Sequence, residues 1–459
     1  MTSPYPWPHL TPHYRETLAL GLPLIVAQLG QIVLGMVDSA MIGQYAMLDL
    51  SAASFCINLF NLPIFFALGF GYALTPRIGQ RYARGELLDA AATLRYGLII
   101  NVLLGLLLTL IMGALYWCIP YFGQPVELLG RIQAYYLTVV VALTFITAFN
   151  ALKQFTDALG DTKVSMWIML AGNVGNIFLN WLLIFGHWGF PALGLLGAGI
   201  ATAAMRLLMP VVLLVYIVSA PRYRRYRKGF LAPQLPRGEM GRLTSIGTFI
   251  GLQMALENGL FALSIIIVGW LGSVPLAAHH IAVTVQSIGF MIFYGAGAAI
   301  AIRVSHFWGL HQYGNARRAA FGGLHVVFLL AAIVMLLLFL CRDHIPWIFT
   351  DNPHVAALVT SLLLVGLLYQ PADALQVTMA NAARGLGESK SLMIISFIGY
   401  FLIALPLAYC LGIRTPLATV GVWLAYPVGL GLAGLGFLCR FHYVLHQKYK
   451  LHPNAIQTE

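Results

Sequence analysis

Charged residues are scarce in this chain: Asp, Glu, Lys and Arg make up 9% of it, whereas a typical soluble domain holds about 25%. Hydrophobic residues make up 60%, and the mean hydropathy is +0.83. So little charge cannot cover the surface of a water-soluble protein of this size. The composition therefore predicts an all-α integral membrane protein.

Cysteine is also rare, and the few cysteines are scattered. No pair among the five has metal-ligand or C-x-x-C spacing, so we expect them to be small buried apolar side chains. The chain also lacks zinc, phosphate-loop and nucleophile-elbow patterns. We therefore expect a protein that is not an enzyme and that needs no cofactor.

Long apolar runs are what the chain has in abundance. About 20 apolar residues suffice for a helix to cross the hydrocarbon of a bilayer. The N-terminal segment has no basic region and no cleavage site of a signal peptide, so we expect the first run to be a retained helix. Twelve spans are predicted, near residues 17–42, 50–76, 92–117, 132–152, 164–186, 194–219, 244–270, 275–302, 319–340, 354–380, 391–412 and 417–440.

The net charge of +11 is distributed unevenly between the two sides of the predicted membrane. If the N-terminus is cytoplasmic, 22 of the 26 Lys and Arg residues fall on the cytoplasmic side. This is the positive-inside pattern, and it places both termini in the cytoplasm. We expect a multi-pass monomer of the cell inner membrane, with no nucleic-acid partner.

The two halves of the sequence resemble each other at an offset of 226 residues. The offset pairs Gly21 with Gly247 and Arg77 with Arg303, among other matches. Six spans in each half make the repeats parallel, as in transporters that rock two lobes around a central cavity. We predict a cytoplasmic tail (1–13), an N-lobe (14–219), a basic cytoplasmic linker (220–243), a C-lobe (244–445) and a second tail (446–459).

Three acids, Asp38, Glu257 and Asp373, fall within predicted spans, whereas the other twelve fall in loops, tails or helix ends. A charge at the centre of a spanning helix costs about 2.5–3.5 kcal/mol or more, so each of the three is a candidate functional residue. Counted from the basic helix ends, Glu257 and Asp373 lie roughly 22 and 16 Å into the membrane. Tyr369, one turn from Asp373, can point at the same space. These oxygens could hold Na⁺ or share protons.

A second polar set is predicted in the N-lobe. Asp38 lies near the outer end of the first span, and Asn176, Asn180 and Thr202 lie on the fifth and sixth spans. Asn and Thr also join helices in membranes simply by hydrogen bonding, so this interpretation remains open. Arg206 is the only cation expected within a span. Weaker candidates, as substrate contacts, are His280, Gln286 and Phe261.

The sequence resembles the multidrug and toxic compound extrusion family in its NorM-like branch. The residues that carry the resemblance are PLIVAQLGQIVLGMVDSAMIG around Asp38, GNIFLNW and GLLGAGIATA around Asn176, Asn180 and Thr202, ALENGLFAL around Glu257, and LLYQPADALQ around Asp373. The resemblance implies a cation-coupled antiporter that exports amphipathic, often cationic, organic compounds. It also implies a C-lobe cation site of Glu257, Asp373 and Tyr369, and an N-lobe site for Na⁺ or protons of Asp38, Asn176, Asn180 and Thr202.

Two questions stay open at this point. Na⁺ and H⁺ are both compatible with the carboxylates. The alternative function is a flippase for a lipid-linked saccharide, whose diphosphate headgroup calls for Arg or Lys in the cavity, where only Arg206 is expected.

Overall fold

The computed structural model describes residues 11–230 and 238–451. The predicted N-terminal tail lies outside these residues up to position 10, and the predicted C-terminal tail lies outside them from position 452. Within the described part the first helix already begins at Thr11 and the last continues to Leu451, so both helices extend into the predicted tails.

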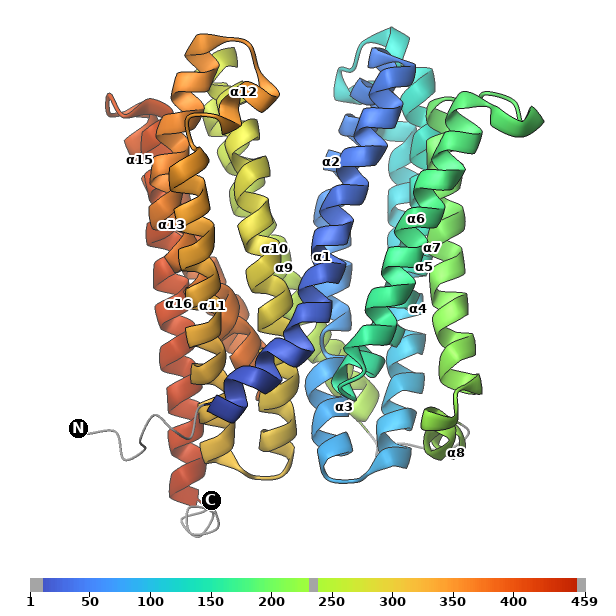
Figure 1. The fold of residues 1–459 in the computed structure, drawn as a ribbon, viewed down its shortest axis with the longest axis vertical. Helices are drawn as coiled ribbons and strands as arrows, with labels where there is room; N and C mark the ends of the chain where they lie inside the picture. Colours follow the sequence, from blue (N-terminus) through green and yellow to red (C-terminus); the bar gives the residue numbers. More distant parts are fainter. Residues whose placement is uncertain (1–10, 231–237, 452–459) are drawn as a thin grey trace. The chain divides into compact units, whose positions relative to one another are not determined.

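The described residues fold into helices joined by short connections (Figure 1). The α-helices are α1 (Thr11–Tyr45), α2 (Met47–Gly71), α3 (Leu74–Ala83), α4 (Leu87–Leu115), α5 (Val126–Ala158), α6 (Thr162–Phe185), α7 (Leu195–Ser219), α8 (Arg227–Phe230), α9 (Glu239–Gly269), α10 (Ser273–Gly309), α11 (Tyr313–Cys341), α12 (Ile345–Phe349), α13 (Pro353–Gly385), α14 (Lys390–Ser396), α15 (Leu405–Ile413) and α16 (Ala418–Leu451). Short 3₁₀ helices occur at η2 (Tyr116–Phe122), η3 (His187–Gly189) and η4 (Pro221–Tyr226), and η5 (Phe397–Ala404) is a π-helix.

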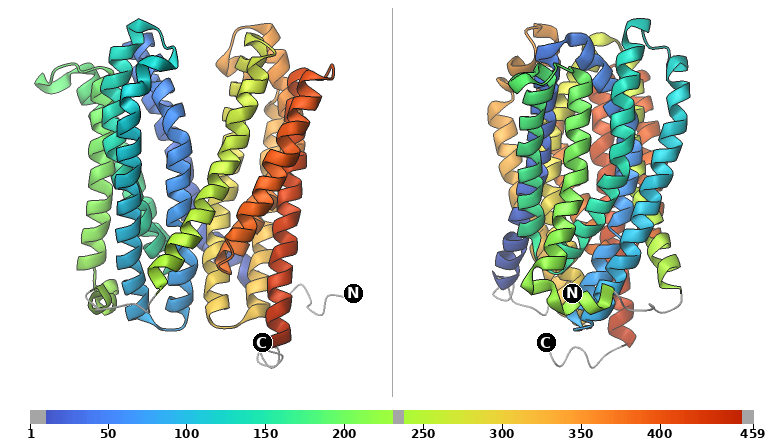
Figure 2. Two further views of the ribbon diagram at one scale, coloured as in Figure 1. Left: turned by 180° about the vertical axis from the view of Figure 1, so that it is seen from behind. Right: turned by 90° about the vertical axis from the view of Figure 1, so that its right-hand side faces the viewer.

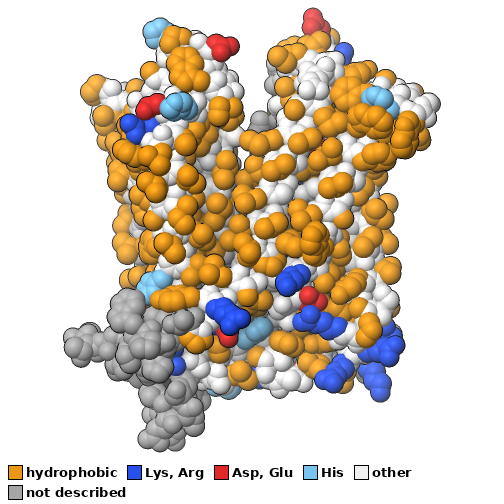
Figure 3. All heavy atoms as spheres, viewed as in Figure 1, with side chains coloured by type: hydrophobic (Ala, Val, Ile, Leu, Met, Phe, Trp, Pro, Cys, Tyr) orange, Lys and Arg blue, Asp and Glu red, His pale blue; other side chains and the backbone are white. Residues whose placement is uncertain are grey.

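Twelve of these helical segments are long and apolar enough to cross a membrane, which confirms the predicted number. Several are longer than predicted, because their polar ends continue the helix beyond the apolar run. The eighth span, for example, is the whole of α10, 37 residues from Ser273 to Gly309. In the space-filling view, apolar side chains cover the middle of the visible face and basic side chains gather toward its lower end (Figure 3).

The helices form two compact units. Unit 1 consists of the chain up to Gln28 and from Leu252 onward, and unit 2 consists of Leu29–Gly251. Both boundaries fall inside a helix, one in α1 and one in α9. Each of these helices therefore contributes its first part to one unit and the remainder to the other. The six-helix lobes with boundaries at 14–219 and 244–445 stay a prediction.

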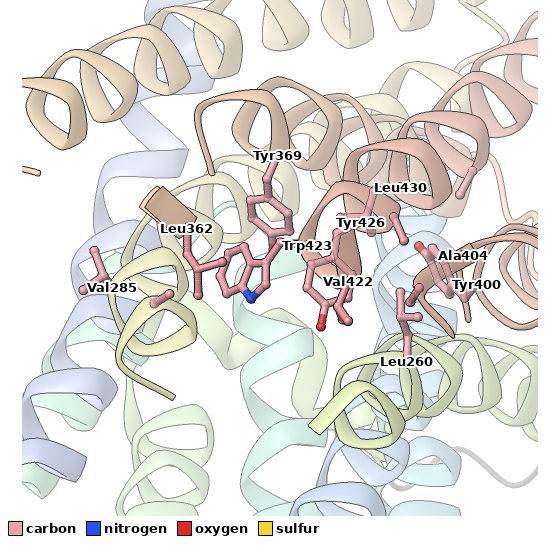
Figure 4. Packing of buried hydrophobic residues seen from close by; sticks show 14 of the residues in the cluster. Leu260, Val285, Leu362, Tyr369, Tyr400, Ala404, Val422, Trp423, Tyr426 and Leu430 are labelled. Atoms are coloured by element: carbon pink, nitrogen blue, oxygen red, sulfur yellow. The ribbon is translucent and has the colours of Figure 1, made fainter. Parts of the chain in front are cut away.

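Each unit has its own hydrophobic core. In unit 1, α13 packs between α10 and α16, and the core is rich in aromatic rings, among them Tyr369, Tyr400, Trp423 and Tyr426 (Figure 4). In unit 2, α5 packs against α4 and α7 around the buried side chains of Phe60 and Tyr136, and the two further views of Figure 2 show these helices running alongside one another. The rings of Phe60 and Tyr136 lie 4.9 Å apart.

The repeat seen in the sequence has a structural counterpart in two ion pairs. Arg77 at the end of the second span contacts both carboxylate oxygens of Glu239, at 2.7 and 2.6 Å, at the start of α9. Its repeat mate Arg303 donates to Glu16, at 2.6 Å, and to Thr17, at 2.7 Å, near the start of α1. Each repeat-related arginine thus binds the first turns of the first helix of the other repeat.

The repeat-related glycines Gly21 and Gly247 each lie at a close contact between two helices, one in unit 1 and the other in unit 2. A Cβ at Gly247 would lie 2.8 Å from the backbone oxygen of Phe70, and one at Gly21 would lie 3.5 Å from the Cβ of Ala299. The small residue lets α9 approach α2 in unit 2 and α1 approach α10 in unit 1.

The expectation that the cysteines are buried was wrong for most of them. Of the cysteines only Cys56 is buried, and the others, Cys118, Cys341, Cys410 and Cys439, are exposed on the apolar surface or at helix ends. A membrane protein can leave such side chains at its lipid-facing surface without exposing them to water. Within the predicted basic linker, Pro221–Phe230 is helical and partly buried.

Candidate functional site

The buried acids of the structure fall into two groups. Four acids that were expected in loops or helix ends are buried beside a basic partner: Asp49 with Arg131, Asp157 with Lys153, Asp161 with Arg222, and Glu239 with Arg77 and Arg81. All four lie at or beside helix ends, as expected, and each has its counter-charge on a neighbouring turn or helix. Such pairs are ordinary stabilising or neutral features of a fold.

Asp38, Glu257 and Asp373 form the second group. Among the ion pairs of the described residues, none involves any of the three acids. Glu257 is 9% exposed and Asp373 1%. A buried charge without a contacting counter-ion destabilises the protein, so each of these acids is a candidate functional residue.

The structure brings the N-terminal set of predicted residues together in unit 2. Asn180 on α6 donates to Asp38 Oδ1 on α1 at 2.6 Å, and also to Asn176 Oδ1 at 3.1 Å. Asn176 in turn donates to the hydroxyl of Thr202 on α7 at 3.2 Å. The four side chains form one chain of hydrogen bonds across three helices, with Asp38, half-buried, at its end.

Three further residues extend this set, and sequence reasoning missed their connection. Gln31, two turns before Asp38, accepts a hydrogen bond from Arg206 at 3.3 Å and donates one to Asn173 at 3.2 Å. Arg206 is also the charged neighbour of Asp38. The signal was present in the spacing, because residues 173, 176 and 180 lie three and four apart on one face of a helix.

The C-terminal set lies in unit 1. Glu257 on α9 accepts a hydrogen bond from Gln376 Nε2 of α13 at 3.3 Å. Tyr369 and Asp373, one turn apart on α13, interact through the tyrosine hydroxyl, and Asp373 is an electrostatic neighbour of Glu257. The structure therefore places Glu257, Tyr369 and Asp373 in one cluster, to which sequence reasoning had not assigned Gln376.

Several oxygen atoms in this cluster have no hydrogen-bond partner among the described residues. They include Asp373 Oδ2 and Gln376 Oε1. Tyr400 is fully buried and is an electrostatic neighbour of both acids. It lies in the π-helix η5, and π turns in α-helices are frequent at functional sites. Unpartnered buried oxygens are the ligands that a hard cation requires.

Arg384 is a buried cation beside this cluster. Arg384 lies near the end of α13, is 5% exposed, and donates to Gln253 Oε1 at 2.6 Å. It is the positive neighbour of Glu257. With Glu257 and Asp373 ionised, the cluster and Arg384 together carry one net negative charge.

The weaker candidates are not gathered into one place. His280 is exposed, whereas its neighbour His279 is buried and accepts a hydrogen bond from Trp423 Nε1 at 3.0 Å. Gln286 is buried and pairs with Gln370 of α13. Phe261 stacks its ring near Tyr369 and Tyr426, with centroids 6.5 and 5.1 Å apart. Phe261 thus borders the C-terminal cluster, and a role of these residues in substrate contact stays a prediction.

Twelve spanning helices, an internal repeat and two buried polar clusters define a membrane transporter with a two-fold repeated architecture. Comparison with known families agrees. The family model MatE matches residues 23–182 and 250–410, so its two matches begin 227 residues apart, one residue more than the offset of 226 found in the sequence. The chain belongs to the MatE family, whose members are transporters and not enzymes.

Individual relatives give the same result. The chain is 30% identical over 443 residues to the multidrug resistance protein NorM of Vibrio vulnificus, covering 95% of this chain and 97% of that one. It is 32% identical over 437 residues to NorM of Vibrio cholerae, covering 94% and 95%. Among solved structures, the eukaryotic MATE transporter AtDTX14 has a TM-score of 0.86 at 19% identity, covering 96% of this chain and 99% of that one.

Proposed function

We propose that this protein is a cation-coupled antiporter that exports amphipathic, often cationic, drugs and toxic organic compounds by alternating access. It acts in the cell inner membrane with both termini in the cytoplasm, as its positive-inside charge pattern indicates. The names of its NorM relatives support drug export, and its membership of a transporter family supports transport as the activity.

The observation that carries the proposal is the absence of contacting counter-ions around Asp38, Glu257 and Asp373 among the described residues. Other buried acids of the same protein are paired, so the fold has the means to neutralise a buried acid. A mobile positive ion is the partner that these three acids lack.

The charge balance favours the C-terminal cluster as the coupling site. Glu257 and Asp373 outnumber their neighbour Arg384 by one negative charge, which one Na⁺ or one proton neutralises. The oxygens of Tyr369, Gln376 and Tyr400 complete an all-oxygen environment for a small cation. Asp38, by contrast, already has one positive neighbour in Arg206, so a cation gains less there.

Coupling requires that the cation favour one conformation over the other. A ligand shifts a conformational equilibrium only by the difference between its affinities for the two states. If a cationic drug and the coupling cation compete for the same negative charge, binding of one releases the other. Exchange then follows without any direct contact between cation and drug.

Fluorescent-dye efflux from vesicles that contain the purified protein tests this proposal. Na⁺ and pH gradients are imposed separately, because carboxylates serve both ions. The variants Glu257→Gln and Asp373→Asn should insert normally and lose gradient-driven ethidium efflux, and Asp38→Asn should lose most of it. Glu127→Gln and Asp351→Asn are matched controls, because both acids are exposed, and they should keep wild-type efflux.

The proposal fails if Glu257→Gln and Asp373→Asn, with matched insertion, both export ethidium at the wild-type rate. It also fails if neither gradient drives wild-type efflux. A dependence on the Na⁺ gradient alone or the pH gradient alone identifies the coupling ion.

A further inference from the structure

The basic segment that follows α7, defined here as residues Pro221–Phe230, is a fixed part of unit 2. It consists of the 3₁₀ helix η4 and the single turn α8. Tyr223 and Tyr226 are buried in it, with 0% and 5% exposure. The sequence alone placed this segment in a basic cytoplasmic linker, because Arg and Lys dominate it.

Aromatic contacts hold the segment against α5. The ring of Phe155, on α5, lies 6.1 Å from that of Tyr223, 5.7 Å from that of Tyr226 and 6.2 Å from that of Phe230. Tyr223 also donates a hydrogen bond to Asp161 at 2.8 Å. Three rings around one phenylalanine fix the segment along its whole length.

The backbone of the segment is fixed against α4 as well. Arg95 of α4 donates to the carbonyl oxygen of Phe230 at 3.1 Å. A Cβ at Gly229 would lie 2.4 Å from the carbonyl oxygen of Leu88, so only glycine allows this approach. The segment is therefore positioned by two helices of unit 2 and has a defined outer face.

That outer face is basic. Arg222, Arg224, Arg225, Arg227 and Lys228 are all exposed, while the aromatic residues between them point inward. Arg222 pairs with Asp161 at 3.2 Å, and Arg227 donates to the carbonyl oxygen of Ser219 at 3.1 Å. The remaining three cations form no ion pair with any described residue.

The two buried tyrosines do not offset this charge at neutral pH. Burial raises the pKa of Tyr226 to about 12. Burial, together with the hydrogen bond to Asp161 and its negative charge, raises the pKa of Tyr223 well above its ordinary value. Both phenols are therefore uncharged, and the face keeps its positive charge over the whole physiological range.

The position of the basic face indicates which kind of partner binds it. Helix α7 directly before it exposes a run of apolar side chains, Val211, Val212, Leu214, Val215 and Val218. A surface of this kind faces lipid tails in a membrane protein. The exposed cations begin four residues after Val218, where this run of exposed apolar side chains ends.

We propose that Arg224, Arg225 and Lys228 form a binding site for the headgroups of anionic phospholipids. Clusters of Lys and Arg immediately beside a spanning helix attract anionic lipids. Guanidinium groups also match the geometry of a phosphate diester through paired N–H donors. A rigid basic segment loses little conformational freedom when it binds, in contrast to a flexible polybasic tail.

Lipid is the expected occupant because the site continues an apolar surface. A nucleic acid or an acidic peptide would make no favourable contact with the exposed valines of α7. A phospholipid contacts both the apolar surface and the cations, with its acyl chains along α7 and its phosphate at the basic side chains. Free phosphate would use the cations alone.

Native mass spectrometry of the full-length protein, titrated with phosphatidylglycerol or phosphatidylcholine in neutral detergent, tests the proposal. Wild type should prefer phosphatidylglycerol, and the preference should fall at high salt. In the triple variant R224Q/R225Q/K228Q, the preference for phosphatidylglycerol over phosphatidylcholine should fall about tenfold. The variant R15Q/R317Q/R414Q removes the same charge from three separate exposed positions and should keep it.

Two further arms keep the test decisive. The variant R224K/R225K/K228R preserves the charge and should retain the lipid preference, which separates loss of charge from misfolding. Excess inorganic phosphate should displace little phosphatidylglycerol. The proposal is overturned if the triple glutamine variant binds phosphatidylglycerol like wild type, if both glutamine variants lose the preference equally, or if inorganic phosphate displaces the lipid.

Discussion

Asn180 donates a hydrogen bond to Asp38 across 2.6 Å although 142 positions separate the two residues in the chain. A hydrogen bond to a charged group contributes about 1.5–3 kcal/mol. The bond therefore helps to keep Asp38 ionised in a partly buried place. It also connects this acid to Asn176 and Thr202, so a change of charge at Asp38 alters hydrogen bonds that join three helices.

We expect Asn180→Leu to reduce drug efflux by about tenfold, because the Asp38 carboxylate loses its donor. The measurement is ethidium efflux from vesicles at matched insertion. Asn315→Leu serves as the control, because the hydrogen bonds of Asn315 are with Gln312 and Arg318. Efflux at the wild-type rate by Asn180→Leu would remove the hydrogen bond from the mechanism.

Arg384→Gln should bind the coupling cation more tightly, by about tenfold or more, because it removes the positive neighbour of Glu257. Cation affinity is measured by calorimetry on the detergent-solubilised protein. Arg384→Lys, which keeps the charge, should bind like wild type. Equal or weaker binding by Arg384→Gln contradicts the charge balance proposed for the cluster.

The two repeat-related ion pairs should differ in their contribution to stability. Glu239 is 5% exposed and contacts half-buried Arg77 and buried Arg81, so Glu239→Gln removes the acid partner of both and should cost about 3 kcal/mol. Glu16 is 61% exposed, and its buried partner Arg303 also donates to Thr17 and to the carbonyl oxygen of His13. Glu16→Gln should therefore cost less than about 1 kcal/mol. Thermal unfolding in detergent measures both. A larger loss for Glu16→Gln would show that exposure does not govern these pairs.

Gly366 on α13 leaves room for Gln286 of α10. A Cβ at position 366 would lie 1.7 Å from Gln286 Nε2, and one at Gly289 would lie 2.7 Å from Gln370 Oε1. Gly366→Ala should therefore destabilise the protein by about 1–3 kcal/mol. Shortening the opposing side chain in the double variant G366A/Q286A should restore part of this loss. The two variants and their combination form a double-mutant cycle for thermal unfolding. Additive effects would mean that the two residues do not touch.

Much of the site could be predicted because a charge within the membrane is energetically costly, so an acid in an apolar span is rare and easily recognised in the sequence. Asp38, Glu257 and Asp373 stand out against apolar neighbours, and Tyr369 follows from helical spacing. The structure then brings Asp38, Asn176, Asn180 and Thr202 into one hydrogen-bonded chain. The additional members, Gln376 and Tyr400, were not found, because neutral polar residues in a span are also common as simple helix contacts.

Other features depend on neighbours that the sequence does not reveal. Asp157 and Lys153 are buried together, although four-residue spacing near a helix end is equally typical of an exposed pair. Whether a residue is exposed to water, exposed to lipid or buried in protein is decided by packing, which explains the wrong expectation for the cysteines.

The sequence by itself determined that the chain crosses a membrane twelve times and that its halves are repeats. It also determined which three acids lie within spanning helices. These features can be derived from sequence because the hydropathy and length of a helix are local properties. Only the tertiary structure decided which buried charges are neutralised by a partner, that α1 and α9 each divide between two units, and that the basic segment after α7 is fixed in place. These depend on contacts between residues distant in sequence, and such contacts exist only when the whole chain packs.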